Sequence, residues 1–255
     1  MTTLLAERFD GVVQLTMHRP EVRNALNTDL LRSLSTALTE IAACEADRAV
    51  VICGSGRAFC SGGDLSETTS NEQRIARLRL MNDVILQMHD LPKPIIAKVR
   101  GPAIGGGLGL ALACDLIVAG EDAVFSAVFA KLGLSLDMGC SWQLVRLVGL
   151  PRAREIAYFG DSISAGQALE MGLINRVVPA DAVDEFVEQW ARRLAASAPL
   201  ALSSDKKLLE RAFRSTLAEG LEAETIYQTV NVGSADADEA RRAFRENRPP
   251  RFAAR

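Results

Sequence analysis

The sequence predicts an α/β fold that continues into a helical C-terminal extension. Short apolar runs with the composition of strands alternate with longer helical patterns as far as residue 180, and only helical patterns follow. Alternation of this kind is typical of sheets covered by helices. Neither a low-complexity linker nor a tandem repeat separates the two parts. We therefore expect an α/β core over residues 1–180 and a helical module over residues 181–255, in one folding unit.

The core is predicted to begin with a β-hairpin. Strand-like residues 4–7 and 12–17 flank Asp10 and Gly11, a dipeptide that favours a two-residue turn. The elements expected next are a helix near residues 28–44, a strand over 49–53, a long polar helix near 66–90 and a strand over 95–99.

Weaker strand patterns complete the predicted core, over residues 116–119, 123–126 and 177–178, with a helix near 141–148. The C-terminal module is predicted to contain helices over residues 183–196, 200–212, 217–230 and 236–245. Pro199 separates the first of these helices from the second, because proline cannot continue a helix from the preceding residues.

Composition and charge exclude several classes of function. The formal net charge is −3 and the cationic residues are spread along the chain, so no nucleic-acid-binding face is indicated. The five cysteines form no Cys-x-x-Cys pair and no histidine stands at metal-ligand spacing, so we expect buried thiols in a reducing compartment and no metal. The N-terminus lacks a secretory pattern, and no run reaches about 18 apolar residues. These observations predict a cytoplasmic protein without a membrane span.

Two glycine-rich turns give the first indication of function. Gly63 and Gly106 each stand between a strand-like run and a helix-like run. Glycine at such a turn can present a bare backbone N–H, and Gly106 is expected near a helix N-terminus. Two such N–H groups that point at one place form an oxyanion hole, which stabilises negative charge on a carbonyl oxygen. Either turn alone is more simply structural, whereas the pair favours a site.

The glycine-rich segments match none of three common glycine motifs. Phe59 stands where a dinucleotide-binding fingerprint that begins at Gly54 needs its third glycine. No Lys-Ser/Thr pair follows a glycine loop, as a phosphate-binding loop requires. Residues 139–143 lack the final glycine of a nucleophile elbow. NAD binding, ATP binding and esterase activity are therefore not indicated.

Motifs along nearly the whole chain resemble one known family. They are His-Arg-Pro at 18–20, Arg-Asn-Ala-Leu at 23–26, Gly-Arg-Ala-Phe-Cys-Ser-Gly-Gly-Asp-Leu at 56–65, Pro-Lys-Pro at 92–94, Gly-Pro-Ala-Ile-Gly-Gly-Gly at 101–107, Cys-Asp-Leu at 114–116 and Ala-Leu-Glu-Met-Gly-Leu-Ile at 168–174. In this order they resemble the crotonase, or enoyl-CoA hydratase/isomerase, superfamily. The resemblance implies a crotonase-like spiral of ββα turns and assembly into trimers or dimers of trimers. It also implies an acyl-CoA thioester as substrate and no separate cofactor, because CoA is part of that substrate.

The resemblance assigns roles to individual residues. It places the thioester carbonyl between the N–H groups of Gly63 and Gly106. It implies contacts to CoA or to the acyl group for Arg23, Ala25, Leu26, Ser61, Asp64, Leu65, Phe129 and Trp142. From the residues alone, Arg23 is equally well explained as a solvated surface charge. Asp64 is more simply explained as the cap of a helix that begins at Leu65.

Two departures from the family pattern argue against hydration. Family hydratases carry two glutamates, and the matching positions here hold Gly109 and Phe129. Adding water to a double bond needs one group that activates the water and a proton source at the α-carbon. Neither glycine nor phenylalanine can supply a proton or accept one, so hydration is disfavoured.

Asp137 is the acid that remains in this part of the sequence. Its Leu-x-Asp-x-Gly-x-x-Trp segment resembles the branch with the ring-epoxide phenylacetyl-CoA isomerase and some enoyl-CoA isomerases, although Leu136 replaces a common proline. In that branch an aspartate moves the proton. The apolar neighbours of Asp137 favour a buried carboxyl group with a raised pKa. A loop or cap aspartate for the helix near 141–148 is the simpler alternative.

The sequence thus predicts an acyl-CoA isomerase. Asp137 would remove an α-proton, Gly63 and Gly106 would hold the enolate oxygen, and the same acid would return the proton to another carbon. Three alternatives stay open: a hydratase-type lyase, a non-catalytic acyl-CoA binder, and the dehalogenation or ring closure in which an aspartate at this place takes part in related enzymes. His18, His89 and Asp115 are predicted to be structural. Residues 243–252 resemble the family segment that can cover the CoA of a neighbouring subunit, and a solvated, frayed tail is the simpler expectation.

Overall fold

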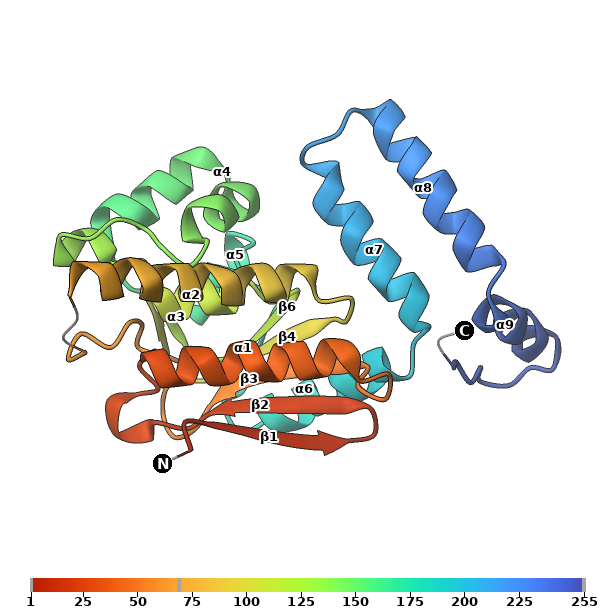
Figure 1. The fold of residues 1–255 in the computed structure, drawn as a ribbon, viewed down its shortest axis with the longest axis horizontal. Helices are drawn as coiled ribbons and strands as arrows, with labels where there is room; N and C mark the ends of the chain where they lie inside the picture. Colours follow the sequence, from red (N-terminus) through yellow and green to blue (C-terminus); the bar gives the residue numbers. More distant parts are fainter. Residues whose placement is uncertain (1, 68–69, 254–255) are drawn as a thin grey trace.

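Figure 1 shows the computed structural model of the chain, which describes residues 2–67 and 70–253. The main sheet has six strands in the order β1-β2-β3-β4-β6-β9. Their bounds are Leu4–Phe9, Val12–Met17, Ala49–Gly54, Ile95–Val99, Leu116–Gly120 and Arg176–Val178. β1 and β2 are antiparallel, and every further neighbouring pair is parallel. The predicted α/β class is confirmed, and so is the hairpin, whose turn residues Asp10 and Gly11 both have positive φ.

A second, smaller sheet leads the chain into the glycine-rich segment. It consists of β5 (Pro102–Ile104), β7 (Val124–Ser126) and β8 (Ile163–Ser164). Ala103 of β5 also forms a parallel bridge with Cys60. The two glycine-rich turns, distant in the sequence, are therefore held side by side by backbone hydrogen bonds.

Helices cover both faces of the main sheet. α1 (Thr28–Ala43) and α2 (Asn71–Asp90) lie side by side across one face in Figure 1. Successive residues of a strand point to opposite faces, and β3 shows this plainly. Val50 and Ile52 join the larger core with α1 and α2, whereas Val51 joins a second core with α6 (Val183–Ala195).

Shorter helices fill the remaining side of the core. α3 (Gly106–Leu112) is buried along its whole length, and α5 (Ala165–Glu170) follows β8. The 3-10 helix η2 (Val128–Leu132) precedes the loop that carries Asp137. α4 (Cys140–Phe159) then starts directly after that loop and is kinked at Gly149, two residues before Pro151.

The last three helices form what we call the C-terminal arm, which extends away from the core in Figure 1. They are α7 (Pro199–Ala212), α8 (Leu217–Val232) and α9 (Ala235–Arg245). Lys206 of α7 attaches the arm to the core, because its Nζ lies 3.0 Å from Oδ2 of Asp115 and donates to the carbonyl of Met88 at 2.9 Å.

The chain returns to the core after the arm. Arg248 forms an ion pair with Glu239 of α9 at 2.6 Å, and the backbone N–H of Arg251 donates to the same carboxylate at 3.0 Å. Arg48 in turn donates to the carbonyl of Phe252 at 3.5 Å. The expectation of a frayed tail is therefore wrong for the described residues 248–253, because buried and paired carboxylates hold them.

One predicted helix begins later than expected. The pattern near residues 66–90 becomes helical only at Asn71, because Ser70 and Gln73 form a reciprocal capping box at that point. Asp64 consequently caps no helix at Leu65. Its Oδ1 accepts instead from the N–H and the hydroxyl of Ser66, in a local turn.

The boundary expected near residue 181 stays a prediction. α6, which follows it directly, packs on the sheet and contributes Val183 and Val187 to the second core. The part that leaves the core begins at Pro199. No helix in the described ranges combines the length and the apolar character that a membrane crossing needs.

Candidate active site

Gly63 and Gly106 meet at the N-terminus of α3. Gly63 forms a parallel β-bridge with Leu26. The backbone N–H of Leu26 donates to the Gly62 carbonyl, and the backbone N–H of Asp64 donates to the Leu26 carbonyl. A Cβ atom at Gly106 would lie 3.6 Å from the backbone nitrogen of Gly63. In the part of the chain that the structure describes, neither N–H has a hydrogen-bond acceptor. Two unpaired donors in this arrangement can share one oxygen, and their use as an oxyanion hole stays a prediction.

Close backbone packing explains why this segment is glycine. A Cβ atom at Gly107 would lie 2.2 Å from the carbonyl oxygen of Cys60, so only glycine lets α3 approach the first turn so closely. Gly105 has φ 54° and ψ −119°, a conformation that favours glycine, and its N–H donates to the Ser126 carbonyl at 2.8 Å. The smaller sheet and the glycines together fix the direction of the Gly106 N–H.

Asp137 stands in the loop between η2 and α4, next to the same helix N-terminus. Its Oδ1 is buried and accepts no hydrogen bond within the described residues. The backbone of the two residues that follow, Met138 and Gly139, has positive φ (49° and 76°). The Cγ atom of Met138 lies 3.5 Å from the Cβ position of Gly106, which places the loop directly on the oxyanion segment.

The environment of Asp137 suits a general base. Burial raises the pKa of Asp137 to about 6, and the charge of Arg77 opposes part of this rise. The alternative that Asp137 caps the following helix is wrong. The N-cap residue of α4 is Gly139, and no side chain caps the helix by a hydrogen bond. Asp137 therefore contributes no visible structural hydrogen bond through its buried oxygen, and a carboxylate of this kind is free to exchange a proton.

The position of Gly109 leaves no room for a replacement acid. A Cβ atom at Gly109 would lie 2.4 Å from Cβ of Met138 and 2.6 Å from its carbonyl oxygen. The loop of Asp137 therefore occupies the space that a side chain at position 109 would need. Phe129 is buried in η2, with ring atoms 3.9 Å from the Cβ position of Gly105.

A charged pair that the sequence did not single out borders this site. Nη2 of Arg77 on α2 donates to the Leu26 carbonyl at 2.6 Å, and its Nε lies 3.1 Å from Oε2 of Glu67. Nη2 is also 3.7 Å from the Cβ position of Gly63. No local pattern marks Arg77, because it is one of several arginines in a polar helix.

The residues expected to contact CoA lie around the first glycine turn, and their role stays a prediction. Arg23 is exposed with φ 53°, and its carbonyl accepts from the Ser61 N–H at 3.0 Å. The Ala25 carbonyl accepts from Arg19, which also forms a 2.9 Å ion pair with Asp64. Leu65 is 76% exposed, whereas Leu26 is fully buried beneath the oxyanion segment. The Asp64 side chain thus serves the fold, and Leu65 offers an exposed apolar surface.

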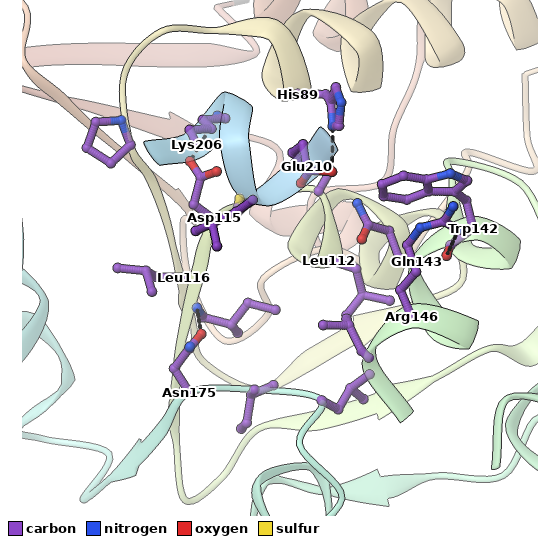
Figure 2. A pocket seen from close by; sticks show the side chains of 18 of the residues that line it. His89, Leu112, Asp115, Leu116, Trp142, Gln143, Arg146, Asn175, Lys206 and Glu210 are labelled. Atoms are coloured by element: carbon purple, nitrogen blue, oxygen red, sulfur yellow. Dashed lines mark hydrogen bonds and ion pairs between the residues drawn. The ribbon is translucent and has the colours of Figure 1, made fainter. Parts of the chain in front are cut away.

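Trp142 lines two neighbouring cavities. Figure 2 shows its ring between His89 and Arg146. The Arg146 guanidinium lies 3.7 Å from the ring centroid, and His89 contacts the ring edge. One cavity, of about 430 Å³, extends from these residues toward Asp115 and Lys206, and a second, of about 380 Å³, reaches Gly139 and Ile85. Trp142 therefore lines space beside the Asp137 loop that is large enough for part of a ligand.

Two residues expected to be structural have structural contacts. Asp115 accepts from the N–H of Ile95 at 2.7 Å and pairs with Lys206, so it fixes α7 to the sheet. His89 has its Nδ1 3.8 Å from Glu210 of α7, and it too lies where the arm meets the core.

Known proteins resemble this chain along its whole length. The family model described as enoyl-CoA hydratase/isomerase matches residues 7–255. A probable enoyl-CoA hydratase from Rhodobacter capsulatus is 38% identical over 255 residues, which cover 99% of this chain and 98% of that one. The 1,2-epoxyphenylacetyl-CoA isomerase of Escherichia coli is 34% identical over 258 residues, with the same coverage. The crystal structure of an enoyl-CoA hydratase from Bacillus anthracis aligns with a TM-score of 0.97 at 31% identity, over 100% of both chains.

Proposed function

The chain belongs to the enoyl-CoA hydratase/isomerase family, and on this basis we propose that it is an isomerase that moves a double bond in an acyl-CoA thioester. One observation carries the proposal. Asp137 holds a buried carboxylate oxygen without a hydrogen-bond partner, and the next residue of its loop, Met138, lies 3.5 Å from the Cβ position of Gly106, whose N–H is unpaired in the described residues, as is that of Gly63. The two hydratase positions, Gly109 and Phe129, hold no acid.

A single carboxylate is sufficient for this reaction. Ionised Asp137 takes a proton from the α-carbon of a 3-enoyl thioester, and the electron pair of the broken C–H bond forms the dienolate. The N–H groups of Gly63 and Gly106 hold the negative oxygen. The carboxylic acid then gives the same proton to the γ-carbon, and the double bond ends next to the thioester. Protons and electrons balance without a second reactant, so no cofactor beyond the CoA of the substrate is proposed.

The acyl group is proposed to extend from Asp137 toward the 380 Å³ cavity. Its walls are apolar near the loop, where Ile85 and Leu86 of α2 face Gly139 and Trp142. α2 leads from Arg77 at the reacting end to His89 at the far end, so one helix would line the whole acyl path. Walls of this kind suit an aliphatic or an aromatic acyl group.

Assembly into a homo-oligomer, a trimer or a dimer of trimers, is part of the proposal. The arm exposes large apolar side chains, which is unusual for a surface that stays in water. They include Leu209, Phe213, Leu217, Leu221, Ile226, Val230 and Phe244. Repeated association through such a face is the common way in which identical chains bury it.

Hydration is the second candidate, because two relatives carry the names probable enoyl-CoA hydratase and 2,3-dehydroadipyl-CoA hydratase. The test compares isomerisation of 3-enoyl-CoA thioesters, aliphatic and aromatic, with hydration of crotonyl-CoA by the same preparation. We expect isomerisation, exchange of the α-proton with deuterated solvent, and little or no hydration. Efficient hydration would overturn the proposal, and acyl-CoA binding without α-proton exchange would indicate a non-catalytic binder.

A further inference from the structure

The 380 Å³ cavity runs along one turn of α2, away from the Asp137 loop. Cγ2 of Ile85 lies 3.3 Å from the Cβ position of Gly139, so the cavity begins at that loop. His89, which also lines it, stands one turn further along α2, at a rise of about 6 Å. An acyl group that follows the cavity therefore leads away from the reacting end toward the arm.

This cavity has no acid in its lining. Its charged and polar lining side chains are Asn82, His89, Gln143 and Arg214, and all four can donate a hydrogen bond. Among the described residues that form its wall, none is aspartate or glutamate. A ligand group that accepts hydrogen bonds, and above all an anion, therefore matches this lining better than a methyl group does.

Arg214 is the lining residue with a permanent charge. It lies in the turn between α7 and α8, where its backbone N–H donates to the Arg211 carbonyl at 2.9 Å. Its guanidinium is 5.9 Å from the centroid of the Trp142 ring and forms no ion pair within the described ranges. An arginine whose planar fork is unoccupied beside a cavity suits a carboxylate, which it can bind through two parallel hydrogen bonds.

Trp142 holds a second cation that no acid pairs. The Arg146 guanidinium lies 3.7 Å from the ring centroid, and its Nη1 donates to the Trp142 carbonyl at 3.0 Å. Its Nε is buried and has no hydrogen-bond partner in the part of the chain that the structure describes. Figure 2 shows Arg146 and Gln143 beside the ring, in the adjoining 430 Å³ cavity, which shares Trp142 and Gln143 with the first. Two guanidinium groups at one indole ring make this end of the acyl path positive.

The acids of this region line the adjoining cavity and not the one that begins at Gly139. They are Asp115, Asp205 and Glu210. Oε2 of Glu210 lies 3.8 Å from Nδ1 of His89, so this acid balances the histidine whenever the ring is protonated. Within residues 2–67 and 70–253, Arg214 has no such partner. It is therefore the cation left for a ligand.

We propose that the acyl group of the substrate ends in a carboxylate, and that Arg214, assisted by Gln143, is the specificity-determining residue that binds it. This inference rests on the proposed function, which places the thioester at Gly63 and Gly106 and the acyl group in this cavity. The arm then takes part in selecting the substrate, because it presents Arg214 beside the Trp142 ring.

The test measures the binding of saturated acyl-CoA thioesters, which an isomerase cannot convert. Hexanoyl-, octanoyl- and decanoyl-CoA are compared by calorimetry with adipyl-, suberyl- and sebacyl-CoA, which have the same chain lengths and end in a carboxylate. At the length that reaches Arg214, the carboxylate should improve the affinity about tenfold or more. High salt should reduce this gain, because Arg214 is exposed to solvent. Equal or weaker binding of every carboxylate-ended thioester would overturn the proposal.

Variants of Arg214 assign the preference to this residue. Arg214→Gln should remove the preference and leave the affinity for methyl-ended thioesters unchanged. Arg214→Glu should reverse it, because like charges then face each other. Arg211→Gln is the matched control: Arg211 is exposed, stands three residues earlier and does not line this cavity, so the preference should remain. A preference that survives in both Arg214 variants, or that Arg211→Gln removes equally, contradicts the proposal.

The same experiment separates this inference from the proposed function, with CoA alone as the reference for the nucleotide part. Tighter binding of the carboxylate series without any isomerisation of 3-enoyl-CoA would refute the isomerase and support the carboxylate subsite. Isomerisation of methyl-ended substrates without a preference for the carboxylate would refute the subsite and support the isomerase. If no thioester binds more tightly than CoA, both proposals are wrong.

Discussion

Met138 fills the place beside α3 that a side chain on Gly109 would occupy: the Cβ of Met138 lies 2.4 Å from the Cβ position of Gly109. The absence of an acid at position 109 and the presence of Asp137 therefore have one steric cause. The loop that carries Asp137 fills the space that a larger residue at position 109 would need. A hydratase-like acid at 109 could return only if this loop moved.

The first prediction concerns Gly109. Gly109→Ala should destabilise the protein by about 1–3 kcal/mol, because the new methyl group overpacks the Asp137 loop. Thermal unfolding measures the effect, and isomerase activity should fall with it. Gly166→Ala is the control: Gly166 lies in α5 with nothing within 4 Å of its Cβ position, and alanine there should stabilise by about 0.5–1 kcal/mol. Equal stability changes in the two variants would contradict the steric account.

The second prediction concerns the proposed base. Asp137→Asn keeps shape and polarity but cannot accept the α-proton, so isomerisation should fall about 10²-fold or more while acyl-CoA binding persists. The measurement is isomerisation of 3-enoyl-CoA together with α-proton exchange in deuterated solvent. Asp161→Asn, which alters an exposed surface ion pair with Lys131, should leave both unchanged. If wild type and Asp137→Asn exchange the proton equally fast, Asp137 is not the base.

The third prediction is a pair of opposite pH effects at Asp137, whose pKa burial raises to about 6. Activity needs the ionised form, so kcat/KM should fall about tenfold per pH unit below about 6. Stability runs the other way. The folded state holds the proton more tightly than the unfolded state, so ionisation destabilises the fold as pH rises from about 4 through about 6.

Asp137→Asn removes that destabilisation. The variant should therefore be more stable than wild type at pH 8, by less than the roughly 1.4 kcal/mol per pKa unit of a fully buried group, because the carboxyl is partly exposed to solvent. The difference should disappear below about pH 4, where wild-type Asp137 is neutral in both states. Denaturant unfolding at both pH values measures it, and a variant that is less stable than wild type at pH 8 would show that Asp137 supports the fold.

The fourth prediction separates two properties of Gly106, its backbone N–H and its lack of a side chain. Gly106→Ala keeps the N–H, and its Cβ would meet Leu26 and Met138 at ordinary distances of 3.4 and 3.5 Å, so much of the activity should remain. Gly106→Pro removes the N–H at the first position of α3, where proline suits a helix. Losing one oxyanion donor should lower kcat by about 10²–10³-fold. Equal activity of the two variants would show that this N–H does not hold the substrate oxygen.

The fifth prediction concerns the arm. Leu217 and Phe244 are 80% and 88% exposed, and we expect association to cover them. Light scattering should give the mass of a trimer or a hexamer. Replacing both residues with glutamate should lower that mass, because a charge buried at an interface without a partner is strongly unfavourable. A wild-type protein that is monomeric at micromolar concentration would remove the prediction.

Local patterns made much of the fold predictable. The strands β2 and β4 and the helices of the arm follow from runs whose apolar spacing matches their structure, and Asp10-Gly11 marks the hairpin turn. β5 and β8 escaped prediction because strands of three and two residues are too short to show a period. The start of α2 was misplaced because Asp64, which looks like a cap, is held by Arg19 and Ser66 instead.

The candidate site, like the fold, was predictable only in part. The glycine turns and Asp137 were found because motifs carry them, and family resemblance supplied the link between segments far apart in the sequence. Arg77 and Glu67 were missed because their contacts join segments far apart in the sequence, from α2 to the Leu26 carbonyl and from Glu67 to Thr28. The clash at Gly109 was also beyond prediction, since a sequence can show that a side chain is absent but not what stands in its place.

The return of the chain from the arm to Arg48 has a mechanical consequence. The arm leaves the core at Pro199, shortly after Ala195, and the chain comes back at Phe252. Ala195 and Phe252 line one cavity of about 410 Å³ at a single corner of the molecule. Residues 199–252 are thus a loop anchored at both ends, which limits the hinge motion that a free arm would have. Exchange of the arm between subunits, as in domain swapping, would require both anchors to open. The apolar face of the arm is accordingly presented in a fixed orientation before any partner arrives, so less conformational entropy is lost when subunits meet.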